Sequence, residues 1–310
     1  MVFLLLKFAI KDFHDDVKYR NLSPKTISGY LMTLNEFQEY AFNNELVNVE
    51  DIRTGTIRSY LLYCREERGN NPTTTNSKLH TLKVFFNYLE REEVIQSAKL
   101  NPIRGIMFAK EDIQIQTFNE NHIKQILNYY RRSKDKYSSF SAYRNYCMVI
   151  FFLGSGARLG EAVNLRWNDV DLVNGVLVLY GKKREQSSIP VTDKLIKELA
   201  EYKVFCEQHF KESSDYVFVT DENKKLAVDT VKTIFKRLKR DMNFKDVRCS
   251  PHTFRHTFAK NYLMNGGDAL SLQKMLRHKQ LAMTQRYVNL FGTELRKLND
   301  QYNPLQHMDI

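Results

Sequence analysis

Apolar residues recur at helical spacing throughout the first hundred residues. Behind Ser23 and Pro24, an N-cap followed by proline at the first helical position, they fall every three or four residues. These positions are Ile27, Tyr30, Leu31, Leu34, Phe37 and Ala41. Further helices are predicted over residues 56–68, up to a Gly-Asn-Asn-Pro stop, and from about Thr73 onwards. We therefore expect a helical N-terminal domain over residues 1–100.

The stretch over residues 101–117 has no clear amphipathic period. It begins with Asn101-Pro102, and the residue before a proline is disfavoured in a helix. The missing pattern predicts an extended linker, which leaves residues 118–310 as a second domain.

The apolar pattern of the second domain is mixed. Helical spacing dominates, and two short β segments at residues 176–180 and 188–191 flank a basic turn. Further helices are predicted over residues 121–132, 143–153, 193–209, 228–242 and 253–265. The sequence thus predicts a mainly α fold with a small β-sheet, of the α+β class, in two domains.

The composition is that of a globular protein. With 310 residues, 43% of them apolar, the chain can bury a core in each domain. Residues 1–10 are apolar apart from Lys7, but they lack a basic start and a small-residue cleavage site. A first packed helix is therefore expected rather than a signal peptide. No stretch approaches the roughly 20 apolar residues that span a bilayer, so we expect a soluble, cytoplasmic protein without a membrane partner.

The cysteines and histidines show no metal or redox pattern. The four cysteines, Cys64, Cys147, Cys206 and Cys249, form no C-x-x-C pair, which argues against a zinc site and a disulfide framework. The eight histidines lack the spacing of metal ligands as well. We therefore expect no metal site and a reducing compartment.

The charge balance favours a polyanionic partner. Lysine and arginine outnumber aspartate and glutamate by 47 to 36, a formal charge of +11, although many basic proteins bind neither DNA nor RNA. In the N-terminal domain Lys25, Arg58, Lys78 and Lys83 fall on or near the polar helix faces. Together they are compatible with a face that follows phosphates, and the alternative for each alone is a solvated charged surface.

The segment Ser250-Pro-His-Thr-Phe-Arg-His256 predicts another capped helix start. It places His252 and Arg255 at i and i+3 on one face, beside the free backbone N–H groups of the first turn. Such a helix start attracts anions. The alternative is a capped surface helix that happens to carry basic residues.

Three further segments carry candidate residues. Arg158 follows a glycine-rich helix end, and its planar, permanently charged guanidinium suits phosphate; a plain ion pair with Glu161 is the alternative. Lys182 lies at the basic tip of the predicted hairpin, where lysine is also a common protection of sheet edges. His278 and Tyr287 lie near the end of the sequence, and either one alone indicates nothing.

The order and spacing of these segments resemble the tyrosine recombinase family of phage integrases and Xer-type recombinases. Lys182 lies 24 positions after Arg158, and Tyr287 lies nine positions after His278, both close to the intervals of the family. The resemblance covers the whole chain and implies a helical core-binding (SAM-like) DNA-binding domain, a linker and a catalytic domain. The matching motif residues are Arg158, Lys182, His252, Arg255, His278 and Tyr287.

The family chemistry is cleavage and rejoining of DNA strands. The resemblance implies that Tyr287 attacks a phosphodiester and forms a 3′-phosphotyrosine. Arg158 and Arg255, aided by His278, would bind the non-bridging oxygens and stabilise the charge of the transition state. No metal, nucleotide or organic cofactor and no small-molecule substrate is expected.

The same chemistry needs proton transfer. With a pKa of about 10, roughly one tyrosine in a thousand is ionised at pH 7, so an acceptor is required. The resemblance makes His252 the base and Lys182 the acid for the departing 5′ oxygen. Two positions depart from the family pattern: Arg277 replaces the usual glycine before the second histidine, and the turn lacks the glycine after the lysine. Lys183 or Arg184 is therefore an alternative to Lys182.

The partners implied by the resemblance are double-stranded DNA and further copies of the chain. Recombination joins two duplexes, so a homotetramer on DNA is expected. Residues 291–302 are predicted to form an amphipathic helix with Leu295, Leu298 and Tyr302 on its apolar side. In the family such a helix docks into a neighbouring protomer, and the alternative is that it packs on its own domain.

Three other functions compete with this interpretation. A type IB topoisomerase shares the chemistry, but the spacing from His278 to Tyr287 and the separate helical domain argue against it. A non-catalytic DNA-binding regulator on the same fold would lack a catalytic residue, and none is missing from the motif. An RNA-binding protein has only the basic charge in its favour, without a recognisable module.

Overall fold

The computed structural model describes residues 4–97, 99–111, 114–137, 139–181, 185–212 and 214–291, without the side chains of residues 134–137. The chain divides into two compact units, Met1–Ile113 and Gln114–Ile310. Each has its own hydrophobic core. The expectation of a mainly helical fold with a small sheet is confirmed.

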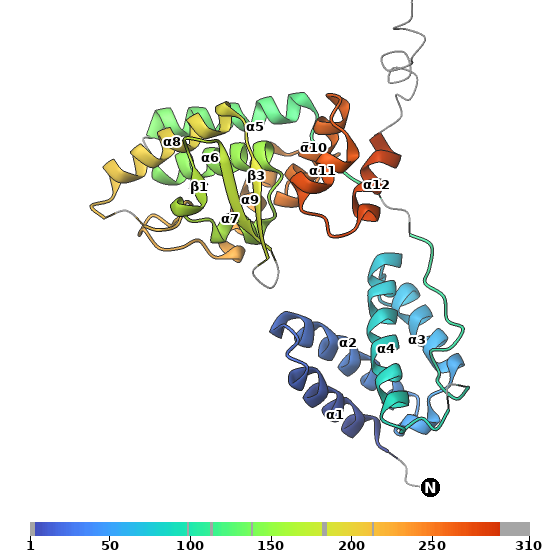
Figure 1. Cartoon of the computed structure of the whole chain (residues 1–310). Coiled ribbons are helices and arrows are strands. Elements are labelled where there is room, and N and C mark those ends of the chain that lie inside the picture. The colour runs from blue at the N-terminus through green and yellow to red at the C-terminus, as the bar shows by residue number, and fades with distance from the viewer. Residues whose placement is uncertain are drawn as a thin grey trace, which may run out of the picture. The chain divides into compact units, whose positions relative to one another are not determined.

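The first unit contains the helices α1 (Leu6–Tyr19), α2 (Pro24–Asn43), α3 (Thr54–Glu66) and α4 (Pro72–Arg91) (Figure 1). Two caps fix helix starts: Ser23 Oγ accepts the Thr26 N–H at 3.2 Å, and Asn71 Oδ1 accepts the Thr74 N–H at 2.8 Å. Edge-to-face aromatic contacts fill the core between the helices. The predicted helices are therefore present, with a first helix at the N-terminal end.

Residues 101–109, expected to be an extended linker, pack onto α4 instead. Ile103 and Ile106 are buried in the core of the first unit, and the Asn101 side chain donates to Glu90 at 2.7 Å. Asn76 binds the backbone of Ala109 through both amide atoms, at 2.8 Å each. Burial of its apolar side chains thus attaches this segment to the first unit, although its sequence has no helical spacing of apolar residues.

One basic residue of the first unit lies elsewhere than expected. Lys78 is buried and forms an ion pair with Glu36, whose carboxylate also accepts the Tyr60 hydroxyl at 2.8 Å. Burial opposes ionisation of Glu36, but these hydrogen bonds and the lysine charge lower its pKa overall. Lys78 therefore stabilises the interior of this unit and is not on its polar face.

The second unit combines helices with a small antiparallel sheet (Figure 1). Its helices are α5 (Glu120–Tyr137), α6 (Phe140–Ser155), α7 (Leu159–Asn164), α8 (Asp193–His209), α9 (Val228–Met242), α10 (Pro251–Met264), α11 (Ala269–Leu276) and α12 (Leu281–Phe291). The strands β1 (Val170–Asp171), β2 (Val176–Tyr180) and β3 (Gln186–Pro190) lie in sequence order, with Leu177 opposite Ile189.

Helix α6 lies at the centre of this unit and contacts α5, α8 and α10. It is apolar almost all round, with Phe151 and Phe152 fully buried, as expected for a helix surrounded by other elements. The predicted helix over residues 291–302 falls almost entirely outside the described residues. Among the helices that are described, none is long and apolar enough to cross a membrane.

Candidate active site

The start of α10 has the expected form. Ser250 Oγ accepts the Thr253 N–H at 3.2 Å, and Pro251 occupies the first turn. Arg255 then points into the protein and is 3% exposed, whereas His252, one turn earlier, is exposed. The capped helix therefore presents the two motif residues at different depths.

Arg255 is held by the ends of two other helices. Its guanidinium donates to the carbonyl of Gly156, the C-cap of α6, and to that of Leu276, the last residue of α11, at 2.6 Å each. Burial, with the positive charges of Arg158 and Arg277, lowers the pKa of Arg255 to about 9. Arg255 still carries its charge at neutral pH.

Arg158 lies at the N-cap of α7 and is tied to Glu161. The Arg158 N–H and guanidinium donate to the two carboxylate oxygens at 2.7 and 2.9 Å, and the guanidinium also donates to the Arg277 carbonyl at 3.1 Å. Its side chain remains 39% exposed, while that of Glu161 is 3% exposed. Glu161 and the Arg277 carbonyl thus hold Arg158 in place, while its exposed part can bind an anion from solution.

Arg277, which stands where the family usually has glycine, adopts the left-handed conformation with φ of 55°. This is a conformation that glycine adopts most readily. Here the buried Arg277 guanidinium donates to Glu161 at 2.8 Å and to the Met275 carbonyl at 2.7 Å. Burial opposes ionisation of Glu161, but the charge of Arg277 and the hydrogen bonds from Arg158 lower its pKa overall. The turn before His278 therefore forms with arginine at the left-handed position.

His278 and Tyr287 lie face to face. Their rings are parallel within 6°, with centroids 6.2 Å apart, and His278 Nδ1 is hydrogen-bonded to Thr284 Oγ1 at 2.8 Å. Burial and the neighbouring arginines lower the pKa of His278 to about 4. Tyr287 is 4% exposed, and burial raises its pKa against the opposing charges of Arg255 and Arg158. The phenol is therefore neutral and lies within reach of two cations.

The Tyr287 hydroxyl contacts a residue that sequence reasoning missed. His256 Nδ1 lies 2.7 Å from Tyr287 Oη. The expected base, His252, instead packs its ring edge-on against the ring of His256, with the two ring centroids 4.2 Å apart. Burial, with the charges of His252 and Arg255, lowers the pKa of His256 to about 4. A signal was present in the sequence: positions 252 and 256 are one helical turn apart and share a face.

Lys182, with the alternatives Lys183 and Arg184, lies outside the described residues. The flanking strands are described. Just beyond their paired ends, next to the hairpin tip, the Gly181 N–H donates to the Glu185 carbonyl at 2.8 Å. The Glu185 side chain pairs with Lys279 at 2.5 Å, and Lys279 directly follows His278 in the sequence. The tip end of the hairpin therefore contacts the turn that carries His278.

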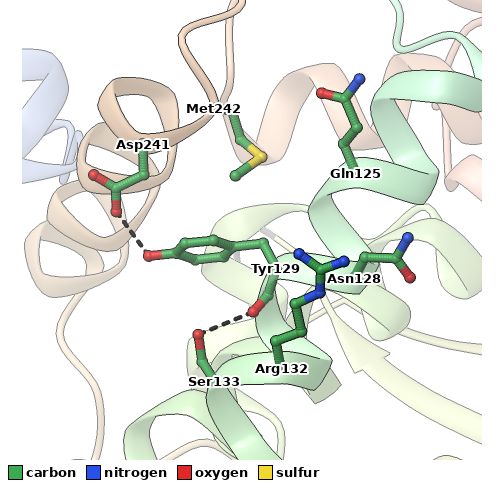
Figure 2. A pocket seen from close by; sticks show the side chains of 7 residues that line it. All are labelled: Gln125, Asn128, Tyr129, Arg132, Ser133, Asp241 and Met242. Carbon is green, nitrogen blue, oxygen red and sulfur yellow. Dashed lines mark hydrogen bonds between the residues drawn. The ribbon is translucent and has the colours of Figure 1, made fainter. Parts of the chain in front are cut away.

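An open hollow of about 570 Å³ lies elsewhere in this unit, between α5 and α9 (Figure 2). Tyr129 on α5 donates to Asp241 on α9 at 2.8 Å across it, and Arg132 extends along its side. The described lining contains none of the motif residues. The motif residues that the structure describes gather instead at α10, α11, α12 and the start of α7, where the guanidinium groups of Arg158 and Arg255 lie near the phenol of Tyr287.

The sequence matches known families over both units. It matches the Phage integrase family over residues 116–294 and the N-terminal SAM-like domain of phage integrases over residues 10–93. The tyrosine recombinase XerC of Thermodesulfovibrio yellowstonii is 28% identical over 313 residues, which cover 98% of each chain. XerC of Leptospira interrogans is 26% identical over 286 residues, covering 92% of this chain and 89% of that one.

Solved structures share the fold. XerH site-specific recombinase bound to a palindromic difH substrate has a TM-score of 0.73 at 19% identity, covering 93% of this chain and 82% of that one. A lambda integrase dimer bound to a COC′ core site has a TM-score of 0.71 at 18% identity, covering 94% and 79%. The chain therefore belongs to the phage integrase family of tyrosine recombinases.

Proposed function

We propose that this chain is a site-specific recombinase that cleaves and rejoins double-stranded DNA through a covalent bond between Tyr287 and a 3′ phosphate. The observation that carries the proposal is the position of Tyr287: its phenol is buried near Arg255 and Arg158, whose positive charges favour the phenolate form. The two solved structures described above, XerH and lambda integrase, are bound to DNA sites. The surplus of positive charge suits the same partner.

The two arginines bind the scissile phosphate in this proposal. Arg158 presents an open guanidinium, and Arg255 lies beside it, anchored by two carbonyls. Their donors stabilise the charge that develops on the non-bridging oxygens, and one such contact contributes about 3 kcal/mol. His278 and the exposed His252 supply further donors to the phosphate at the same surface.

The departing 5′ oxygen needs a proton, and Lys182 is the proposed donor. The ion pair between Glu185 and Lys279 supports this role because Glu185 lies three residues after Lys182 and attaches the tip end of the hairpin to the turn of His278. The product is a 3′-phosphotyrosine, which keeps the energy of the broken bond. A 5′ hydroxyl of another strand then reverses the reaction and seals the DNA.

Covalent trapping tests the proposal. DNA flanking the gene is made as nicked duplexes that release a short 5′ fragment on cleavage, and the SDS-resistant adduct is measured. After equal DNA binding has been established, the wild type should form the adduct and Tyr287→Phe should not. Specific binding without an adduct from the wild type would refute the cleavage reaction and indicate a regulator that only binds DNA.

We also propose that the active assembly is a homotetramer on DNA, because exchange between two duplexes requires four cleavages. The segment after Phe291 would join neighbouring protomers. The test is a truncation that removes residues 292–310, with the mass of the DNA-bound assembly measured on dilution. Tetramers should dissociate at higher protein concentration than those of the wild type, and unchanged assembly would contradict the docking role of this segment.

A further inference from the structure

We infer that His256, a residue outside the motif, accepts the proton of the Tyr287 hydroxyl as the phenolic oxygen attacks the phosphate. The inference rests on the proposed cleavage reaction and assigns its missing base. His256 belongs to α10 and Tyr287 to α12, two helices that pack against each other. Their contact, 2.7 Å from Nδ1 to Oη, is within the range of proton transfer.

The neighbours of Tyr287 differ in whether they can take a proton. Arg255 and Arg158 stabilise a phenolate, but guanidinium groups are donors only. His278 Nδ1 is already engaged by Thr284. In the neutral tautomer that carries its proton on Nε2, His256 has a lone pair on Nδ1, the atom that lies beside Oη, and we assign this tautomer because it lets the Tyr287 hydroxyl donate.

The charges around His256 connect its basicity to the substrate. Burial comes first among the causes that hold its pKa near 4, followed by the charges of His252 and Arg255. A phosphodiester bound at the arginines brings a negative charge that offsets theirs, so the pKa of His256 rises on binding. The groups that face it are His252 and Arg255 on its own helix, Tyr287 on α12 and His278 in the turn before α12.

The proton balance of the step is complete. As the Oη–P bond forms, the Oη–H bond breaks and its proton passes to His256 Nδ1. The P–O5′ bond breaks, and the departing oxygen takes a proton from Lys182. In rejoining, a 5′ hydroxyl attacks, Lys182 regains a proton and His256 returns its own to Tyr287.

The test compares His256→Asn and His256→Ala with wild type on DNA that wild type binds and cleaves. Asparagine keeps an acceptor near the position of Nδ1 and can hold the phenol, but it cannot take the proton. We expect both variants to bind DNA as wild type does and to form the adduct about 10²–10⁴-fold more slowly in single turnover. Between pH 7 and pH 9 their rates should rise about tenfold per unit as hydroxide ionises Tyr287, while the wild-type rate stays flatter.

A substrate with a sulfur atom in place of the bridging 5′ oxygen separates base from acid. A thiolate leaves without protonation, so this DNA should restore Lys182→Ala but leave the His256 variants slow. The matched control is His209→Asn, an exposed histidine at the far end of α8, which should keep the wild-type rate.

Three outcomes would overturn the inference. Wild-type adduct formation by His256→Asn would leave His256 only a positioning role. Rescue of the His256 variants by the sulfur substrate would make the residue part of acid catalysis instead. Failure of wild type itself to form an adduct would refute the cleavage reaction, and this inference with it.

Discussion

At the scale of single residues, the site depends on a buried charge network with one unusual member. Arg277 occupies a left-handed position, which costs a non-glycine residue about 1–2 kcal/mol. In return its guanidinium neutralises Glu161, whose side chain is 3% exposed. Loss of one partner from a buried pair costs about 3–5 kcal/mol, more than the backbone strain, so the arginine is favoured as long as Glu161 is ionised.

Arg277→Gly should therefore lower the free energy of unfolding by about 2 kcal/mol at pH 7, because backbone relief offsets only part of the lost pair. The pKa of Glu161 is lowered in the folded chain from its ordinary 4.5. Its contribution to stability is therefore present above that value and lost as the pH falls through the lowered one. Urea unfolding of both proteins across this range should show the difference shrinking below pH 4.5, and an equal difference at pH 3.5 and 7 would contradict this account.

At the scale of elements, a sharp turn connects α6 to α7 and supports both arginines. Gly156 caps α6 with φ of 58°, and its carbonyl holds Arg255 while Arg158 follows two residues later. A Cβ atom at this position would lie 2.6 Å from the ring of Phe258. The turn therefore requires glycine for two reasons, the backbone conformation and the space.

Gly156→Ala should destabilise the second unit by about 2–4 kcal/mol, the sum of left-handed strain and overpacking. Adduct formation should fall as well, because the carbonyl that anchors Arg255 must move. The control is Gly160→Ala in α7, where nothing lies within 4 Å of an added Cβ and alanine favours the helix. Thermal unfolding of the three proteins measures the effect, and equal transition temperatures for the two variants would contradict it.

The elements and the site were predictable from sequence to different degrees. Helices with caps and a long apolar face, such as α2, α4 and α10, were predicted near their observed bounds because the information is local. The short helices α11 and α12 were not predicted, since eight and eleven residues give too few turns for a period. His256 was missed because its importance comes from α12, and the contact of Arg277 with Glu161 joins positions 116 apart.

At the scale of the whole molecule, two cores imply two stabilities. The aromatic core of the first unit includes Phe37, and that of the second includes Phe151, both fully buried. The single tryptophan of the chain, Trp167, belongs to the second unit and packs against its core. Its fluorescence therefore reports on one unit, whereas far-UV circular dichroism reports on the helices of both.

Phe37→Ala should remove about 3–5 kcal/mol from the first unit alone. The dichroism transition should then split or move to lower urea, while the Trp167 fluorescence transition stays in place. Phe151→Ala is the reciprocal control and should shift the fluorescence. A common shift of both signals in Phe37→Ala would mean that the units unfold as one.

The arginine anchors have a consequence for acid conditions. Arg255 donates to carbonyls at the ends of α6 and α11. Arg158 donates to the carbonyl of Arg277, which caps α11, and to the carboxylate of Glu161. Such helix ends carry partial negative charge from aligned peptide groups. A main-chain carbonyl has no proton to gain, so these anchors persist at pH values that neutralise a carboxylate. Acidification should therefore protonate the base, His256, before it weakens the binding of phosphate by the two arginines. At low pH the recombinase should stop cleaving but stay bound to its DNA.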